Sequence, residues 1–85
     1  MTMSQSLDTK VAVTASIDQE GLTRPRTILL RGQTLTVIAV GRQWEAEEGR
    51  YVLVEMGDGT RYELLLSRRE LSWRIKRAWP VTLAA

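Results

Sequence analysis

The sequence contains no cysteine, no histidine and no phenylalanine. Without cysteine the chain can form neither disulfides nor thiolate metal sites, and this composition fits a reducing cytoplasm. Without histidine it lacks the commonest general base and the commonest nitrogen ligand of metals. The phosphate-binding glycine motifs and the serine-nucleophile motif are missing as well. We therefore expect a protein that is not an enzyme, with no catalytic, cofactor-binding or metal-binding residues.

Long apolar runs are also missing. No segment reaches the roughly 18 apolar residues that a membrane-spanning helix needs, and residues 1–8 lack the apolar stretch of a signal peptide. We expect a cytoplasmic protein that does not contact a membrane. A chain of 85 residues is long enough for one domain and leaves little room for a deep pocket. We therefore expect no small-molecule substrate.

Acidic residues are the remaining side chains to consider for catalysis or cation binding. Glu45, Glu47 and Glu48 precede Gly49, and we interpret them as solvated surface charges, with a hard-cation site as the alternative. Asp58 is explained by its place in an Asp-Gly turn. Hydrolysis by carboxylates needs two of them held apart in a cleft, or a metal with a base. The spacing of these acids does not indicate such a cleft.

Apolar and polar residues alternate along most of the chain, which predicts β-strands. Gly32 is expected to mark a tight turn and Gly41 a bulge or bend. Asp58-Gly59 between two β runs predicts a hairpin with a type I′ turn. Residues 45–49 form a charged connection with room for one helical turn. The strands are expected over residues 10–17, 26–31, 33–40, 50–56, 60–66 and 71–79.

The alternation also predicts which side chains share a face. The first expected strand turns one set of apolar residues to a single face: Val11, Val13, Ala15 and Ile17. Ile38 and Val40 indicate that both faces of their strand are covered toward its end. The last expected strand turns Leu71, Trp73 and Ile75 to the core, with Arg77 on the same side, and turns Arg74, Lys76 and Ala78 to the other face.

Five to six short strands with tight turns predict an all-β fold, a small antiparallel meander. In so short a chain the sheet edges are hidden by curling into a barrel or by pairing with another chain. We favour a strongly bent sheet or a small barrel of SH3-like or OB-like size. The single domain is expected over residues 10–79, between a flexible N-terminus (1–9) and a C-terminal tail (80–85). Residues 10–17 either join this sheet or pair with a partner.

Charge is segregated along the chain. Residues 21–42 hold four arginines and no acid, residues 43–65 hold two arginines and six acids, and residues 66–85 hold five bases and one acid. The bases near the last strand either pair with the acids of 43–65 or form a phosphate-binding groove beside aromatic rings. Trp44 and Trp79 either cap the barrel or serve as exposed contacts. The candidate nucleic-acid or partner contacts are Arg68, Arg69, Arg74, Lys76, Arg77, Trp79 and Trp44.

Residues 24–79 resemble a family of small bacterial β-domains. The resemblance rests on Arg24-Pro25, Arg31-Gly32, Val37 to Val40, Trp44, Asp58-Gly59 with Tyr62-Glu63-Leu64, and Trp73-Arg74-Ile75. Members of this family occur alone, and related segments lie at the C-terminal end of catalytically inactive Y-family polymerase-like proteins of mutagenic DNA repair. The resemblance implies an accessory place in DNA repair or translesion synthesis, without implying a mechanism.

Together these features predict a non-catalytic protein-interaction module. The expected partner is a second copy of the chain or a repair-polymerase-type protein, bound by strand addition to a free edge of the sheet. The alternative is a weak, salt-sensitive nucleic-acid-binding module that uses the basic C-terminal strand.

Overall fold

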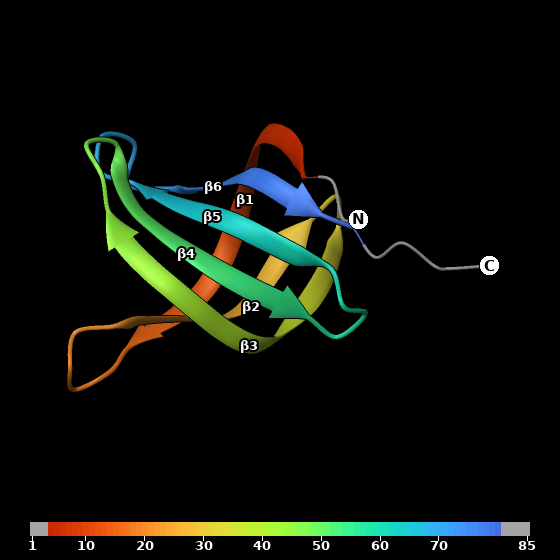
Figure 1. The fold of residues 1–85 in the computed structure, drawn as a ribbon, viewed down its shortest axis with the longest axis horizontal. Coiled ribbons are helices and arrows are strands. Elements are labelled where there is room, and N and C mark those ends of the chain that lie inside the picture. The colour runs from red at the N-terminus through yellow and green to blue at the C-terminus, as the bar shows by residue number, and fades with distance from the viewer. Residues whose placement is uncertain (1–3, 81–85) are drawn as a thin grey trace.

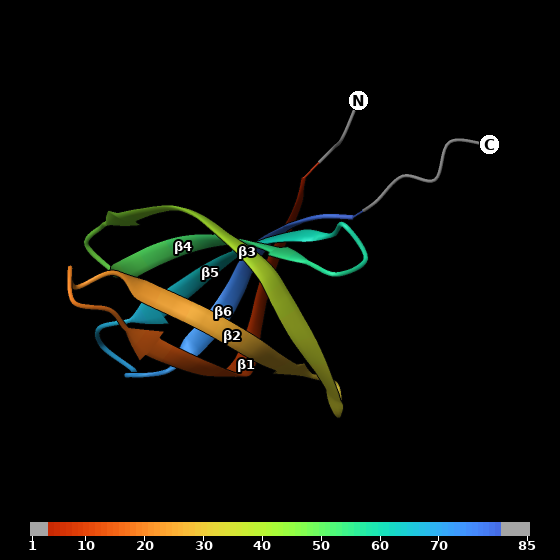
Figure 2. The same cartoon turned by 90° about the horizontal axis from the view of Figure 1, so that it is seen from below.

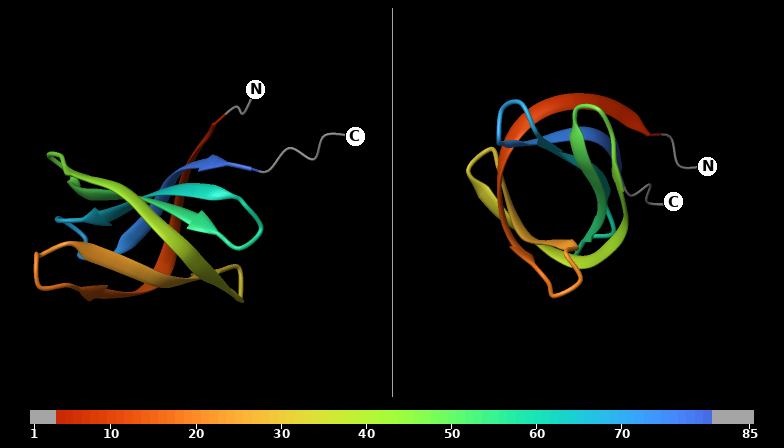
Figure 3. Two further views of the ribbon diagram at one scale, coloured as in Figure 1. Left: turned by 60° about the horizontal axis from the view of Figure 1, so that its bottom comes forward. Right: turned by 90° about the vertical axis from the view of Figure 1, so that its left-hand side faces the viewer.

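The computed structural model describes residues 4–80 as a closed barrel of six antiparallel strands (Figure 1). The strands follow one another around the barrel in chain order, and the first pairs with the last. Seen end-on, they enclose a ring (Figure 3). The predicted all-β fold is confirmed, in its small-barrel form. The strands are β1 (Gln5–Ile17), β2 (Thr23–Leu30), β3 (Gln33–Glu45), β4 (Gly49–Met56), β5 (Arg61–Ser67) and β6 (Trp73–Trp79).

Two long strands close the barrel by changing partner along their length. β1 pairs with β6 through residues 5–11 and with β2 through residues 12–17. β3 pairs with β2 through residues 33–36 and with β4 through residues 37–45. Figure 2 shows β3 crossing from β2 toward β4. The first expected strand therefore joins the sheet, and it begins at Gln5, inside the segment expected to be a flexible N-terminus.

The predicted inward face of β1 holds for only part of the strand. Val11 is buried and Val13 packs against the core, as expected. The pairing of β1 with β2 shifts between Thr14 and Ala15, where Arg26 of β2 is the extra residue, so the alternation of β1 itself continues. Ala15 is exposed and Ile17 is 74% exposed, although they pair with the buried residues Pro25 and Thr23, so the apolar face of β1 is covered only as far as Val13.

The last strand starts later than predicted and also contains a bulge. It begins at Trp73, because Leu71 lies in a turn with a left-handed φ of 53° and is 83% exposed. The predicted core position of Leu71 is therefore wrong. Lys76 is the extra residue where the pairing with β5 shifts. As a result Ala78 is buried and Arg77 is exposed, which reverses their predicted faces.

β3 bends at two bulges. Its pairing with β4 shifts at Ile38 and again at Gly41-Arg42, and bulges bend the strand that carries them. Gly41 thus lies at the bulge predicted for it. Val40 packs against the core, but Ile38 is 59% exposed, so the prediction that both were covered is wrong for Ile38. The bends leave two small residues, Ala39 and Gly41, exposed on the outside of the strand.

The tight turn at Gly32 and the hairpin at Asp58-Gly59 lie where they were predicted, but the second differs in type. Arg31 and Gly32 both have positive φ, so the turn between β2 and β3 is of type I′. Between β4 and β5, the Met56 N–H donates to the Thr60 carbonyl at 2.8 Å and closes a loop of residues 57–59, in which only Gly59 has positive φ. The Asp58-Gly59 hairpin is confirmed, but its turn is a three-residue loop that ends in a left-handed glycine rather than the predicted type I′ turn.

A tight hairpin turn joins β3 to β4, in place of the helical turn considered for residues 45–49. Ala46 and Gly49 exchange two backbone hydrogen bonds, of 2.8 and 3.2 Å. Gly49 has a φ of 149°, and a Cβ at this position would lie 2.0 Å from the carbonyl oxygen of Leu66. Glycine is therefore required where this turn lies against β5.

The barrel interior is filled by aliphatic side chains that alternate along the strands. Trp73 and Tyr62 pack against this core from its margin, as their alternation predicted. The central cluster consists of Val11, Ile28, Val52, Val54, Met56, Leu64 and Ile75. The alternate side chains of β3 to β6 point outward and form the outer surface of the barrel.

Candidate functional site

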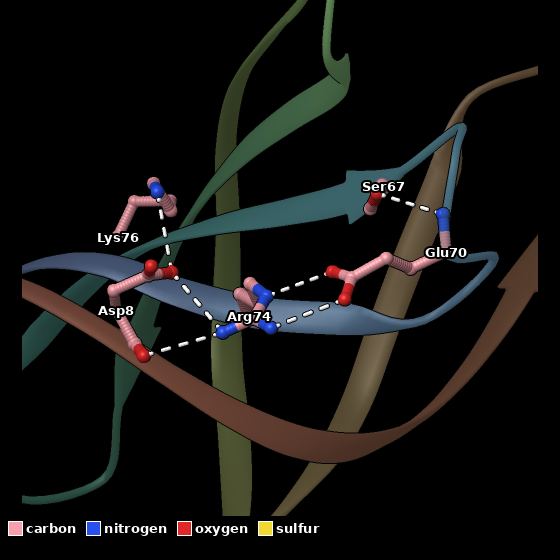
Figure 4. Close-up of polar contacts among 5 residues, drawn as sticks. All are labelled: Asp8, Ser67, Glu70, Arg74 and Lys76. Carbon is pink, nitrogen blue, oxygen red and sulfur yellow. Dashed lines mark hydrogen bonds and ion pairs between the residues drawn. The ribbon is translucent and has the colours of Figure 1, made fainter.

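Acidic side chains hold two of the predicted contact residues, Arg74 and Lys76. Arg74 donates to both carboxylate oxygens of Glu70, at 2.8 and 3.1 Å, and to the carboxylate and carbonyl oxygens of Asp8, each at 3.3 Å (Figure 4). Lys76 contacts the same Asp8 carboxylate at 3.2 Å. The hydrogen bonds to Arg74 lower the pKa of Glu70, and those to Glu70 raise the pKa of Arg74. The Glu70 N–H donates to the Ser67 hydroxyl, which fixes the turn.

The remaining predicted bases divide into one paired and two unpaired residues. Arg68 donates to the Glu45 carboxylate at 3.1 Å and to the Glu47 carbonyl at 3.2 Å. Within residues 4–80, Arg69 and Arg77 form no ion pair. The five predicted bases therefore do not form one unpaired basic strip. The expected pairing with acids of residues 43–65 applies to Arg68.

Trp44 belongs to a small stacked cluster at the end of β3. Its ring stacks on that of Tyr51, with centroids 5.2 Å apart and an interplanar angle of 8°. The Arg42 guanidinium lies 5.3 Å from the Trp44 ring centre, which is within the range of a cation–π contact. The Tyr51 hydroxyl donates to Glu48, and this bond together with burial raises the pKa of Tyr51 to about 12.

Trp79 lines an open groove of about 580 Å³ on the outside of the barrel. Trp79 and Pro80, at the end of β6, form one side of the groove. The small residues Ala39 and Gly41 of β3 form the other side, and Leu53 of β4 lies between the two. The absence of a large side chain at Ala39 and Gly41 leaves this space open.

Strand register explains why these residues meet. Glu55 in β4 pairs with Ala39 on one side and with Arg61 on the other, and Arg61 in turn pairs with Trp79. Directly paired residues lie on the same face of a sheet, so this row crosses four strands on the outer face. Glu55 and Arg61 form an ion pair of 3.5 Å within the row. The groove is therefore a product of pairing between residues that are distant in sequence.

Trp44 and Trp79 do not form one platform. Trp44 pairs with Tyr51, whereas Trp79 lies in the row of Glu55. Four residues of β4 separate these rows, which at about 3.3 Å per residue is roughly 13 Å. The two tryptophans therefore mark opposite ends of the outer face of β4.

Among the residues that line the groove, the sequence analysis named Trp79 as a candidate contact and named none of the others. The sequence signal was present at residues 51–54, where Tyr51, Val52, Leu53 and Val54 form a continuous apolar run. Val52 and Val54 fill the interior, so the alternate residues Tyr51 and Leu53 must face outward. A contiguous apolar patch on the outer face marks an interaction site, whereas a single apolar residue there does not. No sequence pattern identifies Ala39 and Gly41 as groove residues, because their role depends on which residues lie beside them across the sheet.

The acidic segment 45–48 is explained by contacts within the chain. The Glu45 carboxylate accepts from Arg50 at 2.6 Å and from Arg68 at 3.1 Å, and these bonds lower the pKa of Glu45. Glu48 accepts from Tyr51. Within residues 4–80, no three acidic side chains gather closely enough to hold a metal ion. The same residues include no helix long and apolar enough to cross a membrane.

Comparison with protein-family models, curated proteins and solved structures finds no match to this chain. The resemblance of residues 24–79 to small bacterial β-domains therefore stays a prediction. Any assignment of function rests on the groove beside Trp79 and on the charge arrangement around it.

Proposed function

We propose that the protein is a non-catalytic interaction module that holds an extended segment of a partner protein in the groove beside Trp79. The observation that carries this proposal is the groove itself, an open space of about 580 Å³ on the outer face of a small closed barrel. Apolar surface left exposed in this way commonly marks an interaction site. Tryptophan is favoured at such sites because it contributes a large contact area with few rotamers.

The partner is held by side-chain contacts in this proposal. Each described strand of the barrel has a neighbour on both sides, which leaves no free edge strand of the kind predicted for strand addition. The space beside Gly41 and above Leu53 accepts a bulky apolar side chain from an extended segment. Ile38 in β3 precedes Ala39 in the chain and is 59% exposed, so it adds apolar surface beside the groove.

The first partners to test are a second copy of the chain and a polymerase-like repair protein. The second of these, and with it a place in DNA repair or translesion synthesis, rests on the resemblance of residues 24–79 alone. A cytoplasmic location is part of the same proposal and is supported by the absence of cysteine.

Leu53→Arg is the variant that tests the groove. Leu53 is half-buried on the outer face, so arginine can point to water while its charge and bulk block the apolar contact. Leu22→Arg is the matched control, because Leu22 is an exposed leucine in the β1–β2 loop, away from the groove. Binding to the purified polymerase-like protein and self-association in sedimentation are measured for the unchanged chain and both variants.

Loss of either interaction in Leu53→Arg, with retention in Leu22→Arg, is the expected result. Equal binding by both variants would place the contact elsewhere. A chain that stays monomeric and binds no polymerase-like protein would remove the support for this function.

One observation favours nucleic-acid binding as a second candidate. Arg42 lies over the ring of Trp44, which stacks on Tyr51. Arg77, which forms no ion pair within residues 4–80, acts to lower the pKa of Tyr51. Because Arg74 is already held by acids, the double substitution Arg42→Glu and Arg77→Glu tests this surface better than substitutions in the ion-pair cluster. Oligonucleotide binding that falls steeply with salt and is lost in this double variant would favour the second candidate.

A further inference from the structure

We propose that two copies of the chain associate by antiparallel pairing of the second half of β1 with the same half of a second copy. No strand of the barrel is an edge strand along its whole length, but β1 has only one neighbour at a time. It pairs with β6 as far as Val11 and with β2 from Ala12 onward. The side of residues 12–17 that faces away from β2 is therefore an open half-edge.

The backbone groups on this half-edge belong to Val13, Ala15 and Ile17. In an antiparallel pair, the N–H and C=O groups of alternate residues point toward the neighbouring strand and away from it. Ala15 lies opposite Pro25, which has no N–H, so this is a pair whose backbone groups point away from each other. The groups of Val13 and Ile17 point the same way as those of Ala15. In the part of the chain that the structure describes, no turn or loop bonds to them, and β6 pairs no further along β1 than Val11.

The open half-edge lacks the features that usually prevent a strand from pairing with another chain. Such edges are commonly protected by charged residues, proline or bulges, but residues 11–17 contain neither a charged residue nor a proline, and their own alternation continues without a bulge. The half of β3 that pairs only with β4 differs, because it is bent by two bulges and is bridged to β2 by the amide of Gln43. The β1–β2 hairpin also projects away from the β5–β6 turn (Figures 1 and 3), which leaves room beside β1.

The half-edge is complementary to itself. A two-fold axis at Ala15 places Ala15 opposite its own counterpart and Val13 opposite Ile17 of the second copy. These are the residues whose backbone groups are free, and each such pair exchanges two hydrogen bonds. Ile17, which is 74% exposed, gains an apolar neighbour on its own face of the sheet. On the other face Thr14 lies opposite Ser16 of the second copy, which allows the two hydroxyl groups to bond.

Charge at the two ends of the half-edge also favours a second copy as the partner. Lys10 precedes the uncharged stretch and Glu20 follows it, and neither forms an ion pair within residues 4–80. Antiparallel pairing brings the Lys10 end of each copy toward the Glu20 end of the other, whereas parallel pairing would bring like charges together. The same surface patch serves both copies, so the assembly closes at two.

This contact is separate from the groove beside Trp79. The groove and its margin are lined by residues of β3 to β6, of the β4–β5 loop and by Pro80, and none of its lining residues belongs to β1 or β2. The inference therefore goes beyond the proposed function and does not depend on it. A dimer of this kind leaves the groove of each copy accessible to a partner segment.

The test uses Ala15→Lys and Ala15→Asp, because a two-fold axis at Ala15 makes this residue face itself. Ala15 is exposed, so both variants should fold, and far-ultraviolet circular dichroism verifies that they do. Each variant alone places like charges directly opposite one another, which disfavours pairing. We expect sedimentation over a concentration series to show dimers of the unchanged chain and only monomers of either variant. An equimolar mixture of the two variants should form dimers again, because opposite charges then face each other.

Amide hydrogen exchange locates the contact. Exchange at Val13, Ala15 and Ile17 should slow as the concentration of the unchanged chain rises, and it should stay fast in Ala15→Lys. Thr34→Lys is the matched control, because Thr34 is exposed in β3, which is not a neighbour of β1, and this variant should dimerise like the unchanged chain.

An unchanged chain that stays monomeric at every concentration would overturn the inference, and so would a mixture of the two Ala15 variants that stays monomeric. Self-association that is lost in Leu53→Arg and kept in Ala15→Lys would overturn it as well, while supporting the groove as the contact. The reverse pattern would support pairing through β1, and binding of the polymerase-like protein would then decide the function of the groove by itself.

Discussion

The side-chain amide of Gln43 in β3 pairs with both backbone groups of Thr23 in β2. Its oxygen accepts from the Thr23 N–H at 3.1 Å, and its nitrogen donates to the Thr23 carbonyl. Backbone pairing of β2 with β3 is confined to residues 27–30 and 33–36, so Gln43 supplies the bonds that a neighbouring strand would make. Pro25, two residues along β2, has no N–H to satisfy. At this seam between Thr23 of β2 and Gln43 of β3, a side chain takes the place of backbone pairing in closing the barrel.

Gln43→Leu is expected to weaken the barrel at this seam. Thr23 is buried, and leaving a buried backbone group without a hydrogen-bond partner costs about 1–3 kcal/mol. We therefore expect the free energy of unfolding in urea to fall by at least this amount. Gln19→Leu, in the exposed β1–β2 loop, is the control and should change stability by less than about 0.5 kcal/mol. Equal losses in the two variants would show that the Gln43 amide contributes nothing to closure.

Gly49→Ala is expected to be far more damaging than Gly21→Ala. Both glycines have positive φ, but a Cβ at Gly49 would lie 2.0 Å from the Leu66 carbonyl oxygen, whereas one at Gly21 meets nothing within 4 Å. Backbone strain alone accounts for about 1–3 kcal/mol at either position. The clash at Gly49 adds to this and moves β4 away from β5. Thermal unfolding of both variants tests the difference, and similar melting temperatures would contradict the close approach of the β3–β4 turn to β5.

The sequence predicts the all-β class because alternation depends on neighbouring residues, and most of these strands alternate over at least four positions. It does not predict the bulges at Arg26, Ile38 and Lys76, because none of these residues has a backbone preference for a bulge. The closed barrel requires β1 and β3 to bend so that each reaches two partners, and bulges bend the strands that carry them. Beyond the bulge in β6, the predicted faces of Arg77 and Ala78 are consequently reversed.

The candidate site is less predictable than the fold, for a related reason. Trp79 is recognisable by its residue type, but the groove exists because Ala39 and Gly41 lie across the sheet from it. That neighbourhood depends on strand register. The ion pairs between Arg74, Glu70 and Asp8 also join residues that lie as far apart as β1 and β6. Charge segregation along the sequence therefore did not reveal which bases are unpaired.

Leu71→Gly is expected to leave the barrel intact and to stabilise it by up to about 1 kcal/mol. Leu71 has a φ of 53° and is 83% exposed, and glycine adopts this conformation without strain. Leu64→Ala is the comparison, because Leu64 is fully buried and a leucine-to-alanine change in a core costs about 2–5 kcal/mol. Chemical denaturation of both variants distinguishes the positions. If Leu71→Gly lowered the free energy of unfolding by several kcal/mol, Leu71 would have to pack on the core face, as alternation predicted.

Tyr51 is expected to make stability depend on pH in the alkaline range. Its hydrogen bond to Glu48 and its burial raise its pKa from 10.0 to about 12. The folded barrel therefore favours the neutral phenol, and this contribution is complete below the unfolded pKa near 10 and is lost as pH rises toward 12. Phenolate absorbance should show Tyr51 ionising at lower pH in Glu48→Gln.

The matching stability measurement is urea unfolding between pH 9 and 12, at about half-unit steps, for the unchanged chain and Tyr51→Phe. Burial also raises the pKa of Tyr62, but Tyr62 is present in both proteins, so its effect cancels in their difference. We expect the unchanged chain to lose stability more steeply than Tyr51→Phe over this range. Parallel curves would mean that Tyr51 ionises equally easily in the folded and unfolded chains.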